Sequence, residues 1–192
     1  MCTECRMICG YTRLSTGDLG NRFDTAVKGR NIEHSADVLA WTSLIKEAGM
    51  SESNLEDRAA IHDLFTRYCC ALDNGEIETV VDCFTVDAIL KSPVINISGH
   101  DEIRAFAGRF AAQRAAGTQF RHMVSNIAVT IAGSRAAAGA YLLVLISKDG
   151  NHRSLPPGRY ACELIKEDSG QWRFSRRTVF HDHDYTLDEI GR

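Results

Sequence analysis

Four runs rich in β-branched and aromatic residues dominate the second half of the sequence. The runs span residues 120–131, 136–147, 159–167 and 171–180. Residues of these types favour strands, and short connections that contain glycine usually join strands that are neighbours in a sheet. We therefore predict an antiparallel meander over residues 120–180, with residues 149–158 forming a loop inside it.

Three segments with helical spacing precede the meander. In the first, apolar residues recur every three or four positions from Leu55 to Leu72, and Asn74-Gly75 is a typical helix end. A short second helix begins at Ile77, and a third extends from His100 to Gly117, with short extended segments between them. Helices followed by a meander predict an α+β domain, in which three helices pack on one face of a curved, mostly antiparallel sheet.

The first 49 residues differ from the rest, because they show no sustained helical or strand period. We expect a loosely structured extension over residues 1–49, with one short helix over residues 36–48, and a folded domain over residues 50–192. Met50-Ser51-Glu52-Ser53 resembles the beginning of a protein. The extension is therefore an upstream addition, the result of a start assigned too early, or an accessory segment.

Charge and hydropathy exclude several classes of protein. The chain is 44% hydrophobic and 24% charged, which is ordinary for a globular protein, and its formal net charge of -3 gives no electrostatic reason to bind nucleic acid or an anionic membrane. The longest apolar run, residues 136–146, is interrupted by Gly139 and is too short to cross a bilayer. Residues 1–13 lack the apolar core of a signal peptide, so we expect a cytoplasmic protein.

The seven cysteines do not predict a metal site or a disulfide framework. Cys2, Cys5 and Cys9 form a cluster, but no second pair of ligands with zinc spacing follows, so we expect reducible thiols and no bound metal. The other four lie among apolar residues and resemble small core side chains: Cys69, Cys70, Cys83 and Cys162.

Three tracts taken together carry a family signature. They are R-Y-C-C-A-L-D at residues 67–73, R-H-M-V-S-N at residues 121–126, and Y-A-C-E-L-I-K-E-D-S-G-Q-W-R-F-S at residues 160–175. This ordered set resembles the SnoaL-like branch of the nuclear transport factor 2-like superfamily, over roughly residues 53–185. The resemblance implies a strongly curved sheet that forms a cone-like half barrel around an apolar pocket, a homo-oligomer (dimer or trimer), and no cofactor.

The same tracts resemble those of the Asp–His dyad dehydratases, dehydrochlorinases and isomerases of that superfamily. Carried over by position, His122 would remove a proton, Asp73 would orient and support it, and Tyr68 would assist the oxygen that leaves. One dehydratase of the group has a late arginine, and here the sequence offers His181 instead. His181 and His183 alternate along a predicted strand and should not enter one site, so we expect no metal there.

Each of these residues also has a structural interpretation. His122 could be a histidine at the mouth of a strand whose ring is satisfied by a backbone carbonyl, and Asp73 could be a turn aspartate before Asn74-Gly75. Tyr68 lies on the apolar stripe of its helix and could be a core tyrosine with a bonded hydroxyl.

The resemblance therefore implies a cofactor-independent lyase or isomerase that acts on a small apolar cyclic molecule. The expected pocket wall consists of aromatic side chains and one methionine: Phe65, Phe84, Phe106, Phe110, Met123 and Tyr141. Two alternatives remain open, namely a non-catalytic small subunit of a ring-hydroxylating dioxygenase and a binding protein with the same fold.

Overall fold

A computed structural model describes residues 54–185, all within the compact unit Ala40–Arg192 of the chain. The short helix predicted over residues 36–48 and the N-terminal cysteine cluster lie outside the described residues. No helix in the described part is both long and apolar enough to cross a membrane.

Within residues 54–185, three helices precede most of the sheet, as the spacing of apolar residues predicted. They are α3 (Leu55–Asn74), α4 (Ile77–Asp82) and α5 (Gly99–Ala115). Helix α3 ends where Gly75 adopts a left-handed conformation with φ of 75° and donates its backbone N–H to the carbonyl of Leu72. Glycine reaches this conformation without the steric penalty of a Cβ atom, so the predicted helix end is confirmed at residue 74.

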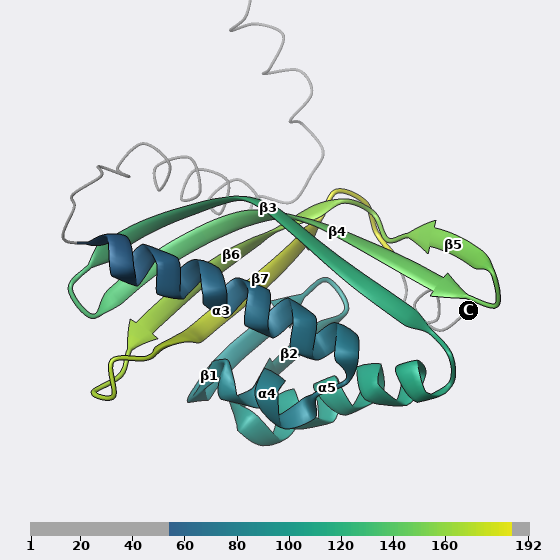
Figure 1. Cartoon of the computed structure of the whole chain (residues 1–192), viewed down its shortest axis with the longest axis horizontal. Helices are drawn as coiled ribbons and strands as arrows, with labels where there is room; N and C mark the ends of the chain where they lie inside the picture. Colours follow the sequence, from purple (N-terminus) through teal and green to yellow (C-terminus); the bar gives the residue numbers. More distant parts are fainter. Residues whose placement is uncertain (1–53, 186–192) are drawn as a thin grey trace, which may run out of the picture. The chain divides into compact units, whose positions relative to one another are not determined.

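In the described part of the chain, seven strands form one open sheet, in the spatial order β2-β1-β7-β6-β4-β3, with β5 paired to β4. The strands are β1 (Phe84–Ser92), β2 (Ile95–Ser98), β3 (Gln119–Ala132), β4 (Arg135–Lys148), β5 (Asn151–Ser154), β6 (Gly158–Lys166) and β7 (Trp172–His181). All pairs are antiparallel except β1 and β7, which run parallel. The α+β prediction is therefore confirmed: three helices pack on a curved, mostly antiparallel sheet (Figure 1).

The segment predicted as a loop over residues 149–158 contains the short strand β5, so that prediction was wrong in part. Asp149 and Gly150 have φ angles of 50° and 79° and form the two-residue turn between β4 and β5. Asp-Gly is a strong sequence signal for this kind of hairpin, because both turn positions need positive φ.

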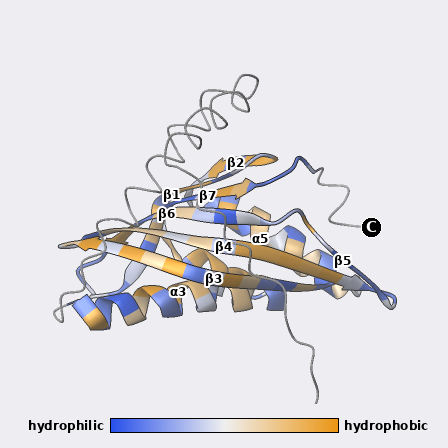
Figure 2. Cartoon of the chain, turned by 90° about the horizontal axis from the view of Figure 1, so that it is seen from above, coloured by the Kyte–Doolittle hydropathy of each residue, from blue (hydrophilic) through white to orange (hydrophobic). Residues whose placement is uncertain are grey.

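The curvature of the sheet has a local cause in β3. The pairing of β3 with β4 shifts between Ser125 and Ala128, and Asn126 has a φ of 53° there. An irregularity of this kind bends a strand and increases its twist. Helix α3 packs against β3, while α5 packs against β1 and β2, so the helices cover the inner face of the curved sheet (Figures 1 and 2).

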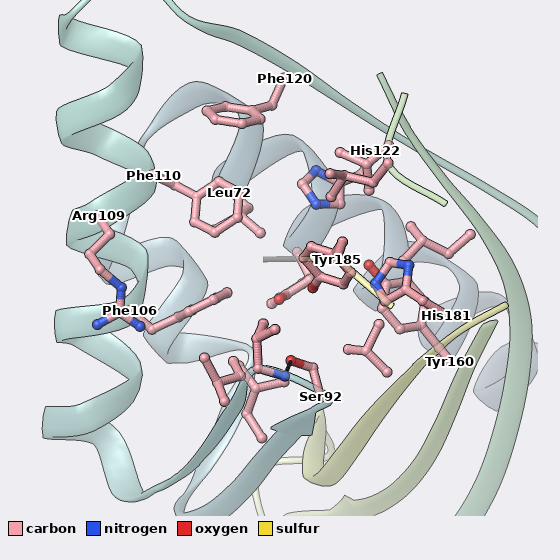
Figure 3. Close-up of a pocket in the computed structure, with 18 of the residues that line it drawn as sticks. Leu72, Ser92, Phe106, Arg109, Phe110, Phe120, His122, Tyr160, His181 and Tyr185 are labelled. Carbon is pink, nitrogen blue, oxygen red and sulfur yellow. Dashed lines mark hydrogen bonds between the residues drawn. The ribbon is translucent and has the colours of Figure 1, made fainter. Parts of the chain in front are cut away.

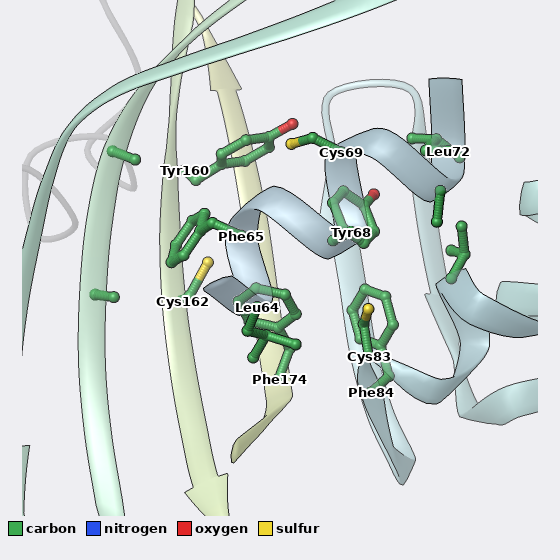
Figure 4. Close-up of a cluster of buried hydrophobic side chains, with 14 of the residues drawn as sticks. Leu64, Phe65, Tyr68, Cys69, Leu72, Cys83, Phe84, Tyr160, Cys162 and Phe174 are labelled. Carbon is green, nitrogen blue, oxygen red and sulfur yellow. The ribbon is translucent and has the colours of Figure 1, made fainter. Parts of the chain in front are cut away.

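The hydrophobic core fills the space between α3 and the inner face of the sheet. Phe65, Tyr68, Phe84 and Phe174 meet there in edge-to-face and tilted contacts, with ring centroids 5.3 to 6.0 Å apart (Figure 4). Each of these side chains is almost completely buried, and burying one stabilises the fold by about 1.5–3 kcal/mol. This core fixes the C-terminal half of α3, which carries two of the predicted catalytic residues, Tyr68 and Asp73.

One arginine links the three elements that surround the predicted site. Arg114, in the last turn of α5, donates to the backbone carbonyl of Asp73 at 3.3 Å and to the side chain of Gln119 at 2.9 Å. The end of α3, the end of α5 and the beginning of β3 are thereby held together, three residues before His122.

Candidate active site

A cavity of about 160 Å³ lies between the inner face of the sheet and the helices α3 and α5. This volume is close to that of an engineered apolar cavity of about 150 Å³ that binds benzene. Most of the wall is apolar, and its polar members are Tyr68, Ser92, Arg109, Gln113, His122, Tyr160, His181 and Tyr185 (Figure 3). The cavity can therefore hold a ring-sized apolar molecule and offer it a few polar contacts.

Asp73 and His122 form a hydrogen-bonded pair beside this cavity. The ring Nδ1 of His122 lies 2.5 Å from one carboxylate oxygen of Asp73, and the backbone N–H of His122 donates to the other at 2.9 Å. The two side chains are only 6% and 12% exposed, His122 and Asp73 respectively. Because both carboxylate oxygens bond to the same residue, neither the carboxylate nor the ring can turn freely.

The partner of Nδ1 determines which ring nitrogen of His122 is available for chemistry. An ionised carboxylate can only accept hydrogen bonds, so Nδ1 carries the proton in the neutral ring, and Nε2 keeps its lone pair. His122 lines the cavity, which makes Nε2 the nitrogen that a bound molecule can meet. A proton taken up by Nε2 would create an imidazolium that the adjacent carboxylate stabilises.

The position of Asp73 is explained by this pair. A negative charge in the last turn of a helix is unfavourable, because the carbonyl end of the helix dipole is itself negative. Asp73 occupies the second-to-last position of α3 and is only 8% exposed. The two hydrogen bonds from His122 offset this unfavourable placement, so the carboxylate is held at the helix end by its partner.

Tyr68 contributes a hydroxyl to the same cavity, one and a half turns before Asp73 on α3. Burial raises the pKa of Tyr68, although the cation of Arg177 opposes that shift. The guanidinium carbon of Arg177 lies 4.1 Å from the centroid of the Tyr68 ring. Tyr68 is therefore protonated at neutral pH and can donate a hydrogen bond to an oxygen in the cavity.

His181 reaches the cavity from the end of β7. Its Nδ1 lies 2.8 Å from the backbone carbonyl of Pro156, and a carbonyl can only accept, so Nδ1 carries the proton in this ring as well. The ring of Tyr185 packs edge-on against His181, with centroids 4.6 Å apart. His181 thus presents Nε2 as a second polar contact in the cavity, while His183 is exposed.

Comparison with known proteins identifies the family. The sequence profile of the SnoaL-like domain matches residues 53–178. The chain belongs to the SnoaL-like family. A solved structure of a candidate aromatic ring hydroxylase from Novosphingobium aromaticivorans is 32% identical to it with a TM-score of 0.59, and the match covers 68% of this chain and 92% of that one.

Other solved structures share the fold of this SnoaL-like domain. A candidate scytalone dehydratase from Novosphingobium aromaticivorans is 22% identical with a TM-score of 0.61, covering 71% of this chain and 92% of that one. A protein from Catenulispora acidiphila, solved in complex with S-DNPA, is 26% identical with a TM-score of 0.59, covering 65% and 92% respectively. No curated protein matches the chain.

The SnoaL-like cavity includes only part of the wall predicted from the sequence. Phe106 and Phe110 of α5 line it, as expected. Phe65 and Phe84 do not, because their rings are buried in the adjacent core. This corrects the prediction for both residues.

Met123 and Tyr141 were also predicted for the pocket wall, and the structure corrects both. They are 55% and 46% exposed and lie on the outer face of β3 and β4. Successive residues of a strand point to opposite faces, so the inward position of His122 places Met123 outside. Tyr141 pairs with Ser125 across the two strands and shares the outer face with it.

Several polar residues around the site were not predicted, among them Arg109, Tyr160, Arg177 and Tyr185. Arg177 is fully buried. Its guanidinium lies 3.7 Å from the centroid of the Tyr160 ring, which lines the cavity. A signal was present, because Arg176 and Arg177 alternate on β7 between an inward and an outward position, and only one of them can be solvated.

Proposed function

We propose that this SnoaL-like protein is a lyase or isomerase that works without a cofactor on a small, mostly apolar cyclic substrate. The observation that carries the proposal is the Asp73–His122 pair at the wall of an apolar cavity. A histidine whose Nδ1 is held by a carboxylate, and whose Nε2 is available, has the arrangement of a general base.

In the proposed reaction, Nε2 of His122 removes a proton from a carbon next to a carbonyl group or to a carbon that bears a leaving group. The C–H electron pair moves into a new double bond, and Asp73 stabilises the imidazolium that forms. In an isomerisation, His122 returns the proton to a different carbon of the substrate. In an elimination, the bond from carbon to the leaving group breaks, the leaving group takes that electron pair, and the proton on His122 passes to it or to solvent.

A hydroxyl donor would hold the substrate oxygen on which negative charge develops. Tyr68 is kept protonated by burial and lines the cavity, so it can donate to this oxygen. The positive charge of Arg177 behind the ring makes the Tyr68 hydroxyl a stronger donor. A fixed donor in a site of low polarity stabilises developing charge without reorganisation at the moment of reaction.

The proposal is tested by proton exchange on a simple probe. In heavy water, the protein should exchange the hydrogens next to the carbonyl of cyclohexanone faster than buffer does, as followed by NMR. His122→Ala and Asp73→Asn should each lower the rate by about a hundredfold or more. Asp63→Asn, which changes an exposed carboxylate on the same helix, should leave it unchanged. Full activity of His122→Ala would refute the proposed role.

A second candidate function is a structural subunit of a ring-hydroxylating oxygenase. It is favoured by the 32% identity to a protein described as a candidate aromatic ring hydroxylase. Under this alternative, the chain would co-purify with a larger iron–sulfur subunit from its native source, and His122→Ala would not alter the activity of that complex. A binding protein with the same fold would instead retain a small molecule and release it unchanged.

A further inference from the structure

The charged groups around the cavity are unevenly distributed. Arg109 is the permanent cation that lines it, whereas no aspartate or glutamate among residues 54–185 does. Asp73 lies behind His122, and both of its carboxylate oxygens bond to that residue. A cleft lined by one sign of charge, with walls of low polarity, concentrates ligands of the opposite sign. The cavity is therefore suited to a molecule that carries a negative charge.

Arg109 lies on α5, across the cavity from His122 and His181 (Figure 3). It is an exposed side chain, with its guanidinium carbon 5.7 Å from the centroid of the Phe106 ring. Within residues 54–185 it has no carboxylate partner. By contrast, Arg104 on the same helix bonds to both Glu78 and Asp101. Arg109 therefore offers its planar set of donors at the edge of the cavity.

Gln113 extends this polar edge by one helical turn. Residues four positions apart on a helix lie on the same face, so Arg109 and Gln113 present a guanidinium and an amide next to each other. Both line the cavity, and Phe106 and Phe110 form the apolar wall beside them. The arrangement combines a place for a ring with two polar groups at its rim.

We propose that the ligand of this cavity carries a carboxylate, which Arg109 binds with help from Gln113, while its ring occupies the apolar space. A guanidinium matches a carboxylate in a two-point contact, which fixes orientation as well as charge. The ring would then lie between Arg109 and His122, with the carboxylate directed away from the general base. This inference rests on the proposed function only in assuming that this cavity is the substrate site.

Binding of benzoate and of its neutral analogue benzamide tests the inference. The full-length protein should bind benzoate about five- to tenfold more tightly than benzamide at low salt, as measured by calorimetry. Arg109→Gln should remove this preference. Arg104→Gln, which removes the same charge from the same helix outside the cavity, should retain it. Equal preference in wild type and Arg109→Gln, or none in the wild type, would overturn the inference.

If Arg109→Gln fails to fold, two measurements on the wild-type protein test the inference instead. Added salt should reduce the preference for benzoate, because a charge pair at the rim is screened. Benzoate should also shift the Nε–H signal of Arg109 in a nitrogen-detected NMR spectrum, and an unshifted signal would overturn the inference. Because both measurements follow binding rather than proton exchange, their outcome is separate from that of the His122→Ala test.

Discussion

At the scale of single residues, Arg177 is a permanent cation that is buried in an aromatic environment. Four aromatic rings surround its guanidinium, and Nη1 lies 3.8 Å from the sulfur of Cys162. Its Nε and Nη2 make no hydrogen bond within the described residues. Contacts with aromatic faces offset part of the cost of burying a charge, but no carboxylate among residues 54–185 forms an ion pair with it. Conflicts of this kind are typical of functional sites.

Substitutions of Arg177 should separate stability from activity. Arg177→Met keeps most of the volume and removes the buried charge, so the free energy of unfolding should stay within about 2 kcal/mol of the wild type. Arg177→Ala leaves a cavity and should lower it by about 3 kcal/mol. Both variants should exchange cyclohexanone hydrogens more slowly, because Tyr68 loses the adjacent cation. Urea unfolding and the exchange assay measure the two effects, and an active Arg177→Met would exclude the electrostatic role.

At the scale of secondary-structure elements, the beginning of β6 positions His181. Gly158 pairs with His181 across β6 and β7, and a Cβ atom on Gly158 would lie 2.1 Å from the carbonyl oxygen of Phe180. It would also lie 3.2 Å from Nδ1 of His181. The close approach of the two strands therefore requires glycine, and it holds His181 next to the carbonyl of Pro156.

Gly158→Ala should force β6 and β7 apart at this point. We expect the free energy of unfolding to fall by about 1–3 kcal/mol, with the NMR signals of the His181 ring shifted. Gly108→Ala is the matched control, because it lies within α5 and its added Cβ meets no atom within 4 Å. That variant should be neutral or slightly more stable, since alanine favours helices. An unchanged His181 signal in Gly158→Ala would contradict this account.

Asp57 connects the first turn of α3 to the far end of the sheet. Lys166 of β6 lies 2.7 Å from its carboxylate and Trp172 of β7 donates to it at 2.9 Å, and these bonds lower its pKa. Because the pKa is lower in the folded than in the unfolded protein, the resulting stability is present above about pH 4 and is lost as the pH falls further.

Asp57→Asn should therefore be less stable than the wild type at pH 7, by about 1 kcal/mol, and this difference should shrink towards pH 3. Asparagine keeps the shape and can still accept the bond from Trp172, so the pH-dependent part reports the charge. Urea unfolding at both pH values measures it. A difference that stays constant between pH 7 and pH 3 would show that the carboxylate charge of Asp57 does not stabilise the fold.

The sequence predicted the helices and strands more accurately than it predicted which side chains line the cavity. Helix and strand periods were long enough to locate the elements, and the family resemblance paired Asp73 with His122. The sequence could not show which apolar faces enclose a cavity and which pack as solid core, because that depends on how the sheet curves. The outward position of Met123 did follow from the inward position of His122, by simple alternation. The burial of Arg177 depends on packing among distant strands, and the alternation of Arg176 and Arg177 along β7 was its only signal in the sequence.

At the scale of the whole molecule, the described part of the chain, residues 54–185, contains a complete core and a cavity. The buried core residues extend from Ile61 to Phe174, and the cavity-lining residues from Tyr68 to Tyr185. The family match begins at residue 53. Homo-oligomer formation stays a prediction, and the exposed Met123 and Leu145 on the outer face of the sheet are where a contact would bury apolar surface.

Residues 50–192 should therefore fold by themselves and retain the site. A shortened chain that begins at Met50 keeps every described element, so we expect one cooperative unfolding transition, with a free energy of unfolding within about 1 kcal/mol of the full chain. Its affinity for benzoate and its rate of cyclohexanone exchange should also match, because no described residue of the cavity precedes Tyr68. Unfolding curves, calorimetry and the exchange assay on the two chains measure these quantities. A shortened chain that folds but loses benzoate binding would show that the first 49 residues contribute to the site.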